Sequence, residues 1–362
     1  MKLSTSIKGI LGWSALALST ALAQPPTTTT PVIPFAPASV STIPSNGDLN
    51  PYGVAFAPPR FPVANSLNPG DVLVSNFNNS ANLAGLGSTI VRFAPNGTTS
   101  TFFQGPAGVG LTGALGIVRH GLVFVGNLPS KDGTSATAST GSLLMLNRTG
   151  TIVGTITDPT VINGPWGMAV NDLGNTAQIF ISNVLNGTVM RLDLSFFENS
   201  DTVRVAATTQ IGGNFAHRLD PNAFVLGPSG LAYDANNDIL YVASSADNAV
   251  YAIANAGSLQ SYTATGTMIY QDFKHLHGAL GLALAPNGDL ICANSDGSNV
   301  DMLQPSEIVE FTTKGVFVSQ FQIDPEAGGA FGVALMNIGG AFRFAAVNDN
   351  QSTLTQWTVP IQ

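Results

Sequence analysis

A short sequence pattern recurs six times along this chain of 362 residues and constrains its fold more than any other feature. Each copy contains a glycine followed by an aliphatic residue and usually an alanine. The glycines are separated by 63, 51, 63, 51 and 51 residues, which is too regular for coincidence. The copies are centred on Gly53, Gly116, Gly167, Gly230, Gly281 and Gly332. The pattern therefore predicts six equivalent structural units.

Each unit is expected to contain four short strands. In the fifth copy, apolar or alternating segments are separated by turns rich in Gly, Asn and Pro, which is typical of strands joined by tight connections. These segments are 281–284, 289–293, 307–311 and 316–322. The fourth copy repeats the succession at 230–233, 239–243, 249–253 and 267–270. A β-solenoid, the alternative for a repeat of this length, has shorter coils and lacks a four-strand cycle.

Four antiparallel strands in a repeat of about 50 residues indicate an all-β fold, a β-propeller with six blades. The last copy ends one strand short of a complete blade, after segments at 342–347 and 353–359. The segment Phe35–Ile43, before the first copy, supplies an unmatched strand. We therefore predict that this N-terminal strand completes the last blade, which closes the ring and removes an exposed sheet edge.

The start of the chain has the features of a secretory signal peptide. Lys2 and Lys8 precede the apolar stretch Ile10–Leu18, and the small residues Ala21 and Ala23 form a cleavage site. A retained N-terminal anchor is the alternative. The predicted location is secreted or periplasmic. The domain division is 1–23 as signal peptide, 24–34 as Pro/Thr-rich linker, and 35–362 as a single propeller domain.

The composition excludes several classes of protein. Only 9% of the residues are charged, against about 25% in an ordinary domain, and 44% are hydrophobic, so the chain is not intrinsically disordered. A net charge of −8 would repel nucleic acid. The single cysteine, Cys292, permits neither an internal disulfide nor a cysteine-based zinc site. We expect a monomer with no membrane span after leader cleavage.

Several segments carry a resemblance to known repeats. They are Gly230–Tyr233, Ile239–Ala243, Asn248–Tyr251 and Gly281–Gly288. The pattern resembles six-bladed propellers of the NHL-repeat kind and their relatives, the gluconolactonase-type hydrolases and the virginiamycin B lyases. The resemblance implies a site at the mouth of the central channel, with Glu, Asn and Asp binding a divalent metal in the gluconolactonase-like families. In the lyases it implies catalytic histidines around the same mouth.

The residues that precede the repeated glycines are expected to form this channel mouth, on what we call the top face. They are Tyr52, Leu115, Trp166, Ser229, Leu280 and Phe331. None offers a carboxylate, an amide or an imidazole, and a hard cation needs several converging oxygens. No metal and no other cofactor is therefore predicted. The ring either receives an apolar or aromatic group of a ligand or simply plugs the channel.

A polar ring is expected where the second strand of each unit ends. Its members are Asn76, Asn127, Asn183, Ser245, Asn294 and Asn348. Asparagine at the end of a strand commonly bonds the local backbone. Alternatively, these amides point inward and bond the polar groups of a ligand.

Three histidines belong to loops that enter the top face. His217 lies in the long segment 212–227, and His275 and His277 precede the Leu280 copy. Two histidines separated by one residue in an extended segment point to the same side. These are the candidate catalytic residues, and a transition metal would accept such ligands. Ordinary loop histidines are the alternative.

The sequence favours an exported propeller that acts as a binding or scaffold module. Its partner would be a small molecule, a glycan or a protein, held at the top face among loops 77–88, 128–141, 212–227 and 294–305. One alternative is an enzyme, a lactone or ester hydrolase or a lyase that uses the loop histidines. Another is a structural protein of the cell envelope.

Overall fold

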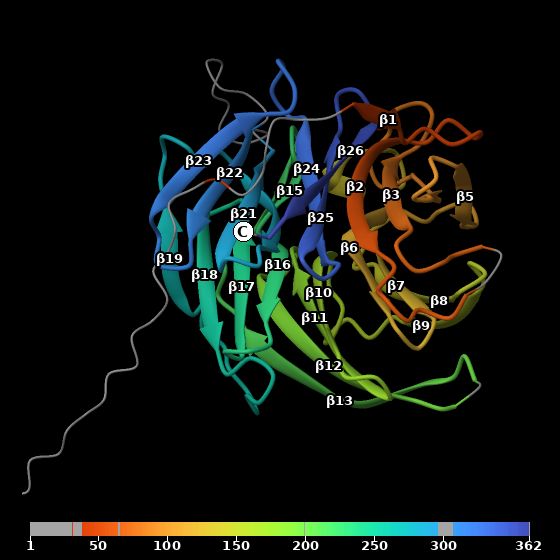
Figure 1. The fold of residues 1–362 in the computed structure, drawn as a ribbon, viewed down its shortest axis with the longest axis horizontal. Coiled ribbons are helices and arrows are strands. Elements are labelled where there is room, and N and C mark those ends of the chain that lie inside the picture. Colours follow the sequence, from red (N-terminus) through yellow and green to blue (C-terminus); the bar gives the residue numbers. More distant parts are fainter. Residues whose placement is uncertain (1–30, 32–37, 64–65, 199, 296–306, 362) are drawn as a thin grey trace, which may run out of the picture.

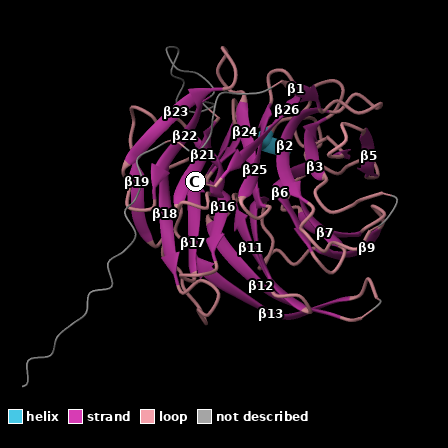
Figure 2. Ribbon diagram, in the orientation of Figure 1, coloured by secondary structure: helices cyan, strands magenta, loops and turns pink. Residues whose placement is uncertain are grey.

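Six antiparallel sheets of four strands follow one another round the molecule in chain order (Figure 1). The computed structural model describes residues 31, 38–63, 66–198, 200–295 and 307–361. Within them, the regular structure is almost entirely strand, and η1 (Ser135–Thr137) is the single helical turn (Figure 2). The prediction of a six-bladed propeller is confirmed. Apart from Pro31, the predicted leader and linker lie outside the described residues.

Each of the first three blades uses consecutive strands. Blade 1 consists of β2 (Leu49–Phe56), β3 (Val72–Asn78), β4 (Thr89–Phe93) and β5 (Thr99–Gln104). Blade 2 consists of β6 (Leu111–Val118), β7 (Leu122–Asn127), β8 (Ser142–Asn147) and β9 (Ile152–Ile156). Blade 3 consists of β10 (Pro165–Asp172), β11 (Thr176–Asn183), β12 (Thr188–Phe196) and β13 (Val203–Gly212).

A short hairpin separates blade 3 from the next blade, and it consists of β14 (Arg218–Asp220) and β15 (Phe224–Leu226). Blade 4 consists of β16 (Pro228–Asp234), β17 (Ile239–Ser244), β18 (Ala249–Ala254) and β19 (Thr267–Gln271). Blade 5 consists of β20 (Ala279–Leu284), β21 (Asp289–Asn294), β22 (Glu307–Thr312) and β23 (Phe317–Gln322). No helix among the described residues has the length and apolar character needed to cross a membrane.

The last blade, blade 6, contains strands from both ends of the described chain. Its strands are β24 (Ala330–Asn337), β25 (Ala341–Asn348), β26 (Thr353–Pro360) and β1 (Ser39–Ser41). In register, Val40 faces Leu354, and the amide of Thr42 donates to the carbonyl of Ser352. The predicted closure of the ring by the N-terminal strand is confirmed, and β1 covers what would otherwise be the open edge of β26.

The repeated glycines allow the innermost strands to approach one another around the channel. The first strands of neighbouring blades are in contact all the way round the ring. A Cβ atom on any of these glycines would lie within 3.0 Å of a carbonyl oxygen of the next blade. Glycine is therefore required by close approach of backbone to backbone. The six are Gly53, Gly113, Gly167, Gly230, Gly281 and Gly332.

Blade 2 differs from the sequence prediction at this position. Gly113 lies against the backbone of the next blade, at the carbonyl of Trp166, whereas Gly116 lies against the side chains of Met168 and Val170. The ladder between β6 and β7 shifts register between Leu111 and Leu115, so Thr112 takes the position before the close backbone contact. Leu115 instead packs in the core between blades 1 and 2. The two glycines lie three residues apart, so the pattern alone selected the wrong one.

Candidate functional site

Four of the predicted mouth residues lie together at the top of the central channel. Tyr52, Trp166, Leu280 and Phe331 line a cavity of about 350 Å³ on the top face, which we call the top pocket. The same four side chains also line a smaller cavity of about 50 Å³ within the channel. They therefore separate the two spaces, so they plug the channel and at the same time form the floor of the top pocket.

Besides Leu280, the floor contains a connected cluster of five aromatic rings. Tyr52 stacks on Phe331, with ring centroids 4.4 Å apart, and meets Trp166 edge to face at 5.1 Å. Phe77 contacts Tyr52, Trp166 and Phe224, each with centroids 5.2 Å apart. We call these five residues the ring cluster. Phe77 and Phe224 lie within the predicted top-face loops 77–88 and 212–227, although neither was predicted as a site residue.

Top-face loops form the walls of the pocket, as the sequence predicted. Asn78, Asn82 and Ala84 come from the 77–88 loop, and Gly133 and Ser135 come from the 128–141 loop. The β14–β15 hairpin contributes the whole run Pro221–Leu226. Ser295 lines the pocket from the 294–305 loop, whose residues 296–305 lie outside the described part of the chain.

Phe224 occupies a strained position in the hairpin. Its φ angle is +64°, in the left-handed region that bulky side chains rarely adopt. Its ring is buried and packs against Phe77. A conformation of this kind costs on the order of 1–3 kcal/mol. The surrounding contacts therefore hold the hairpin in the one arrangement that directs an aromatic ring toward the channel mouth.

Asp349, directly after β25, places a carboxyl group at the pocket wall. Protein atoms surround it closely while one side stays partly exposed, and this burial raises the pKa of its carboxyl to about 7. Its charge also contributes to raising the pKa of Tyr52, which burial already places well above 10. Asp349 directly follows Asn348, a predicted member of the polar ring. It was not predicted as a site residue because nothing in the local sequence distinguishes it from a turn residue.

Several polar atoms at the pocket have unmet hydrogen bonds. The indole N–H of Trp166 and the side-chain oxygens of Asn50 and Asn78 are buried without a hydrogen-bond partner. The Asn78 amide group does donate to Asn82, at 2.8 Å. Buried polar groups are normally paired, so three unpaired ones at a single pocket are a distinctive feature of this face.

The predicted polar ring braces the loops that enter each blade. Asn183 accepts a hydrogen bond from the Asn163 amide and donates to the Val161 carbonyl. Asn294 does the same with the backbones of His277 and His275. Asn76 donates to the Thr42 carbonyl, and Asn127 accepts a hydrogen bond from the Gly110 amide. Asn348 donates to the Asp324 carboxylate. None of these five asparagines lines the top pocket.

The two serines of the predicted rings have different positions. Ser229 is fully buried, and its hydroxyl donates to the carbonyls of Ala243 and Ala279, which ties blade 4 to blade 5. It does not line the top pocket. Ser245 does line it, although its hydroxyl is already bonded to the backbone of Gly227. Of the two, only Ser245 is therefore part of the pocket wall.

The three loop histidines do not line the top pocket, and each of them contacts different residues. His217 is exposed and bonds the Phe215 carbonyl at 2.9 Å. His275 pairs with Asp272 at 2.5 Å and stacks on Phe317, whereas His277 is buried and bonds the Lys274 carbonyl. Within the described ranges, no three His, Cys, Asp or Glu side chains are grouped so that they could hold a metal ion.

The fold and its pocket define a class: a six-bladed propeller whose central channel is plugged by aromatic rings beneath an open top pocket. No protein-family model matches the chain, and neither does any curated protein. Solved structures do match it, and three of them each align with 88–90% of this chain at 11–13% identity.

The first of these is an oxidoreductase (glucose dehydrogenase) from Thermus thermophilus, of which 99% is covered, with a TM-score of 0.48. The second is a luciferin-regenerating enzyme, of which 96% is covered, with a TM-score of 0.49. The third is a glucose dehydrogenase, of which 100% is covered, with a TM-score of 0.50. At 11% identity and a TM-score of 0.50, the third similarity shows a shared fold alone.

Proposed function

We propose that this protein binds a small organic molecule in the top pocket, with an apolar ring of that molecule against the ring cluster. The observation that supports this most is the pocket itself, about 350 Å³ over a floor of five aromatic side chains. Binding sites for small molecules are typically concave and mostly apolar, with a few placed polar groups, and begin at about 300 Å³. Here Asp349 and Asn82 supply polar groups at the wall.

Plugging of the channel and binding of a ligand are compatible roles for the same residues. The plug makes the floor rigid because each ring is held by its neighbours, and a rigid floor loses little entropy when a ligand binds. The site therefore combines a preformed aromatic floor with polar wall residues such as Asn82, Ser135 and Asp349.

Tryptophan fluorescence tests the proposal. Trp357 packs against Phe344 inside blade 6, away from the pocket, so Trp357→Phe leaves Trp166 as the reporter among the described tryptophans. Titration with 2-phenylethanol, a neutral probe with one ring, should change the Trp166 emission saturably. Phe331→Ala removes a ring from the floor and should weaken this binding by about 3–10-fold, since an aromatic contact contributes about 0.5–1.5 kcal/mol.

A matched control separates the pocket from general surface effects. Phe197 is half exposed and does not line the pocket, so Phe197→Ala should leave the affinity unchanged. If the Trp166 emission does not respond, or if the two Phe→Ala variants bind the probe equally well, the proposed function is wrong.

A further inference from the structure

Among the described residues, the wall of the top pocket contains one charged side chain and no side chain of opposite charge. Asp349 is the only acidic residue among the described residues that line the pocket, and no Lys, Arg or His lines it. No hydrogen bond or ion pair joins the Asp349 carboxyl to another part of the described chain. Buried charges are normally paired. This carboxyl therefore lacks the counter-charge that a purely structural aspartate would have.

Asp349 is accessible from the pocket side. It lines the top pocket and also a neighbouring cavity of about 320 Å³, and Asn82 and Asn350 line both spaces as well. Its charge acts on the Tyr52 hydroxyl group, which belongs to the floor. A ligand that rests on the ring cluster is thus within reach of the carboxyl.

The ring cluster, like the Asp349 carboxylate, is suited to a positively charged group of a ligand. The face of an aromatic ring carries partial negative charge and attracts a cation within about 6 Å of its centroid. Tyr52 contacts Phe331 with ring centroids 4.4 Å apart and Trp166 with ring centroids 5.1 Å apart. Aromatic rings beside a lone carboxylate favour a cation with an apolar body.

We infer that the ligand of the top pocket is an organic cation, a protonated or quaternary amine, whose charge faces Asp349 and whose apolar part lies against Tyr52, Trp166 and Phe331. This inference rests on the proposed function and specifies its ligand class. An anionic ligand would meet a like charge and, among the described lining residues, no cation. A neutral ligand, such as a sugar, would leave the Asp349 carboxylate without a counter-charge.

Cation binding should depend on pH because Asp349 must be ionised to attract the ligand. Burial raises the pKa of its carboxyl to about 7, so affinity should rise as the pH increases through this value. Tyr52 is the titratable group that faces Asp349, and its raised pKa keeps it neutral in this range. Behind Asp349, the Asp324 carboxylate is bonded by Asn348 and Asn350, and Glu326 presents its main-chain carbonyl to Asn350.

Three probes of similar size and different charge test the inference with the full chain at 0.15 M salt. They are 2-phenylethylamine, 2-phenylethanol and 3-phenylpropionate. At pH 8, titration by Trp166 fluorescence and by calorimetry should show the amine binding at least tenfold more tightly than the alcohol, with the propionate weakest. For the amine, the affinity should fall at least tenfold between pH 8 and pH 5.5, whereas the alcohol affinity should stay within about twofold.

Substitution of Asp349 assigns the effect to one group. Asp349→Asn, which is nearly isosteric, should reduce the amine affinity at pH 8 at least tenfold and leave the alcohol affinity within about twofold. It should also abolish the pH dependence. Asp201→Asn makes the same change in net charge outside the top pocket and should change neither. If Asp349→Asn does not fold, the pH dependence of the unmodified protein decides.

The outcomes separate this inference from the proposed function. Equal affinities for amine and alcohol, or an amine affinity that Asp349→Asn leaves unchanged, would overturn the cationic ligand while the pocket remains a binding site. If none of the three probes perturbs Trp166 or produces heat of binding, the proposed function and this inference are both wrong.

Discussion

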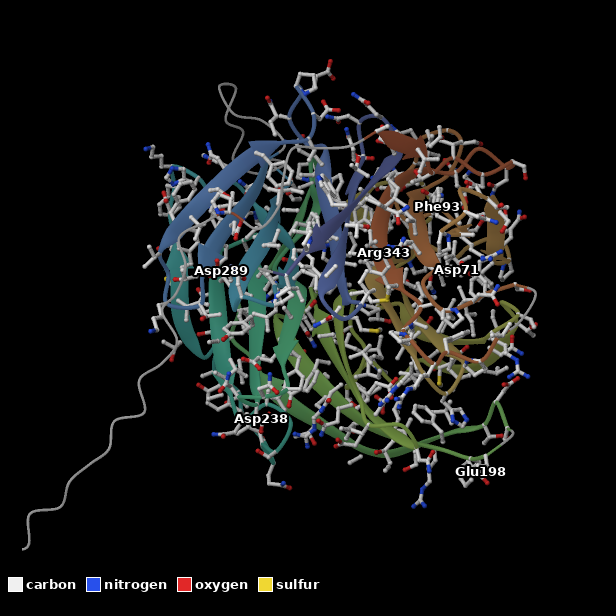
Figure 3. All side chains as sticks on the ribbon, in the orientation of Figure 1. Asp71, Phe93, Glu198, Asp238, Asp289 and Arg343 are labelled. Atoms are coloured by element: carbon white, nitrogen blue, oxygen red, sulfur yellow. The ribbon has the colours of Figure 1, made fainter. Side chains whose placement is uncertain are left out.

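At the scale of single residues, Asp349 is the group on which the proposed ligand class depends. The carboxyl is closely surrounded by protein, and its pKa is raised to about 7 from an ordinary value of 3.8. Keeping such a group ionised at neutral pH costs stability. Groups of this kind occur preferentially at functional sites, where the surrounding fold tolerates the cost. Arg343 and Asp71, which lie near each other between blades 6 and 1, show the contrasting arrangement of opposite charges (Figure 3).

Asp349→Asn should therefore stabilise the protein at alkaline pH. The folded state binds the Asp349 proton more tightly than the unfolded chain, so this contribution to stability is present below about pH 4 and is lost as the pH rises through about 7. At pH 8 we expect the variant to have a free energy of unfolding higher by roughly 2–4 kcal/mol, the lower figure allowing for the exposed side of the carboxyl.

Urea unfolding of both proteins between pH 4.5 and pH 8.5 measures this difference directly. Burial also raises the pKa of Asp289, in blade 5 (Figure 3), which changes the stability of both proteins in the same direction. Comparing the two at each pH removes that common contribution. A difference that does not vary with pH would contradict the assignment of the raised pKa to Asp349.

At the scale of secondary-structure elements, two segments outside the repeat complete the molecule. β1 fills the last position of blade 6, and its three residues are all exposed, so it contributes mainly backbone hydrogen bonds. The β14–β15 hairpin, inserted between blades 3 and 4, covers the channel mouth and positions Phe224 against Phe77. The first element protects an edge, and the second element shapes the pocket.

Removal of β1 should destabilise the ring and expose the edge of β26. A chain that begins at Thr42 should unfold with a free energy lower by roughly 1–3 kcal/mol than a chain that begins at Ala38, because a few backbone hydrogen bonds are lost. It should also aggregate faster, since unpaired strand edges recruit other chains. Thermal unfolding followed by circular dichroism and light scattering measures both effects. Identical unfolding and aggregation of the two chains would show that β1 does not close the ring.

At the scale of the whole molecule, the fold was predictable because the same local information is repeated six times. In the fourth and fifth copies, every predicted strand agrees with the observed one to within two residues at each end. Hydrophobic periodicity and turn residues determine such strands locally. The closing strand was predictable for the same reason. The last repeat was one strand short of a blade, and the segment Phe35–Ile43 was a predicted strand that belonged to no repeat.

The site was only partly predictable, because its residues meet through closure of the ring. Tyr52 and Asp349 lie at opposite ends of the chain, and no local pattern relates them. The aromatic mouth followed from the repeat, so Tyr52, Trp166 and Phe331 were predictable. Leu115 was wrongly placed at the mouth because the register shift in β6 cannot be seen in a sequence with two candidate glycines.

The low charge of the chain now has a structural explanation. Each blade packs its apolar face against the next, and the cores between blades use both faces of most sheets. Strands buried on both faces leave few positions for Lys or Glu. Asp349 is accordingly the single charged side chain among the described residues that line the top pocket.

The central claim is that the top pocket over the ring cluster is the ligand site of this propeller. Crystals soaked with 2-(4-bromophenyl)ethylamine test it most directly, because bromine gives an anomalous signal that locates the probe without ambiguity. We predict a bromine peak inside the pocket, next to Tyr52, Trp166 and Phe331, with the amine directed to Asp349. A probe found elsewhere on the molecule while the pocket stays empty would contradict the claim.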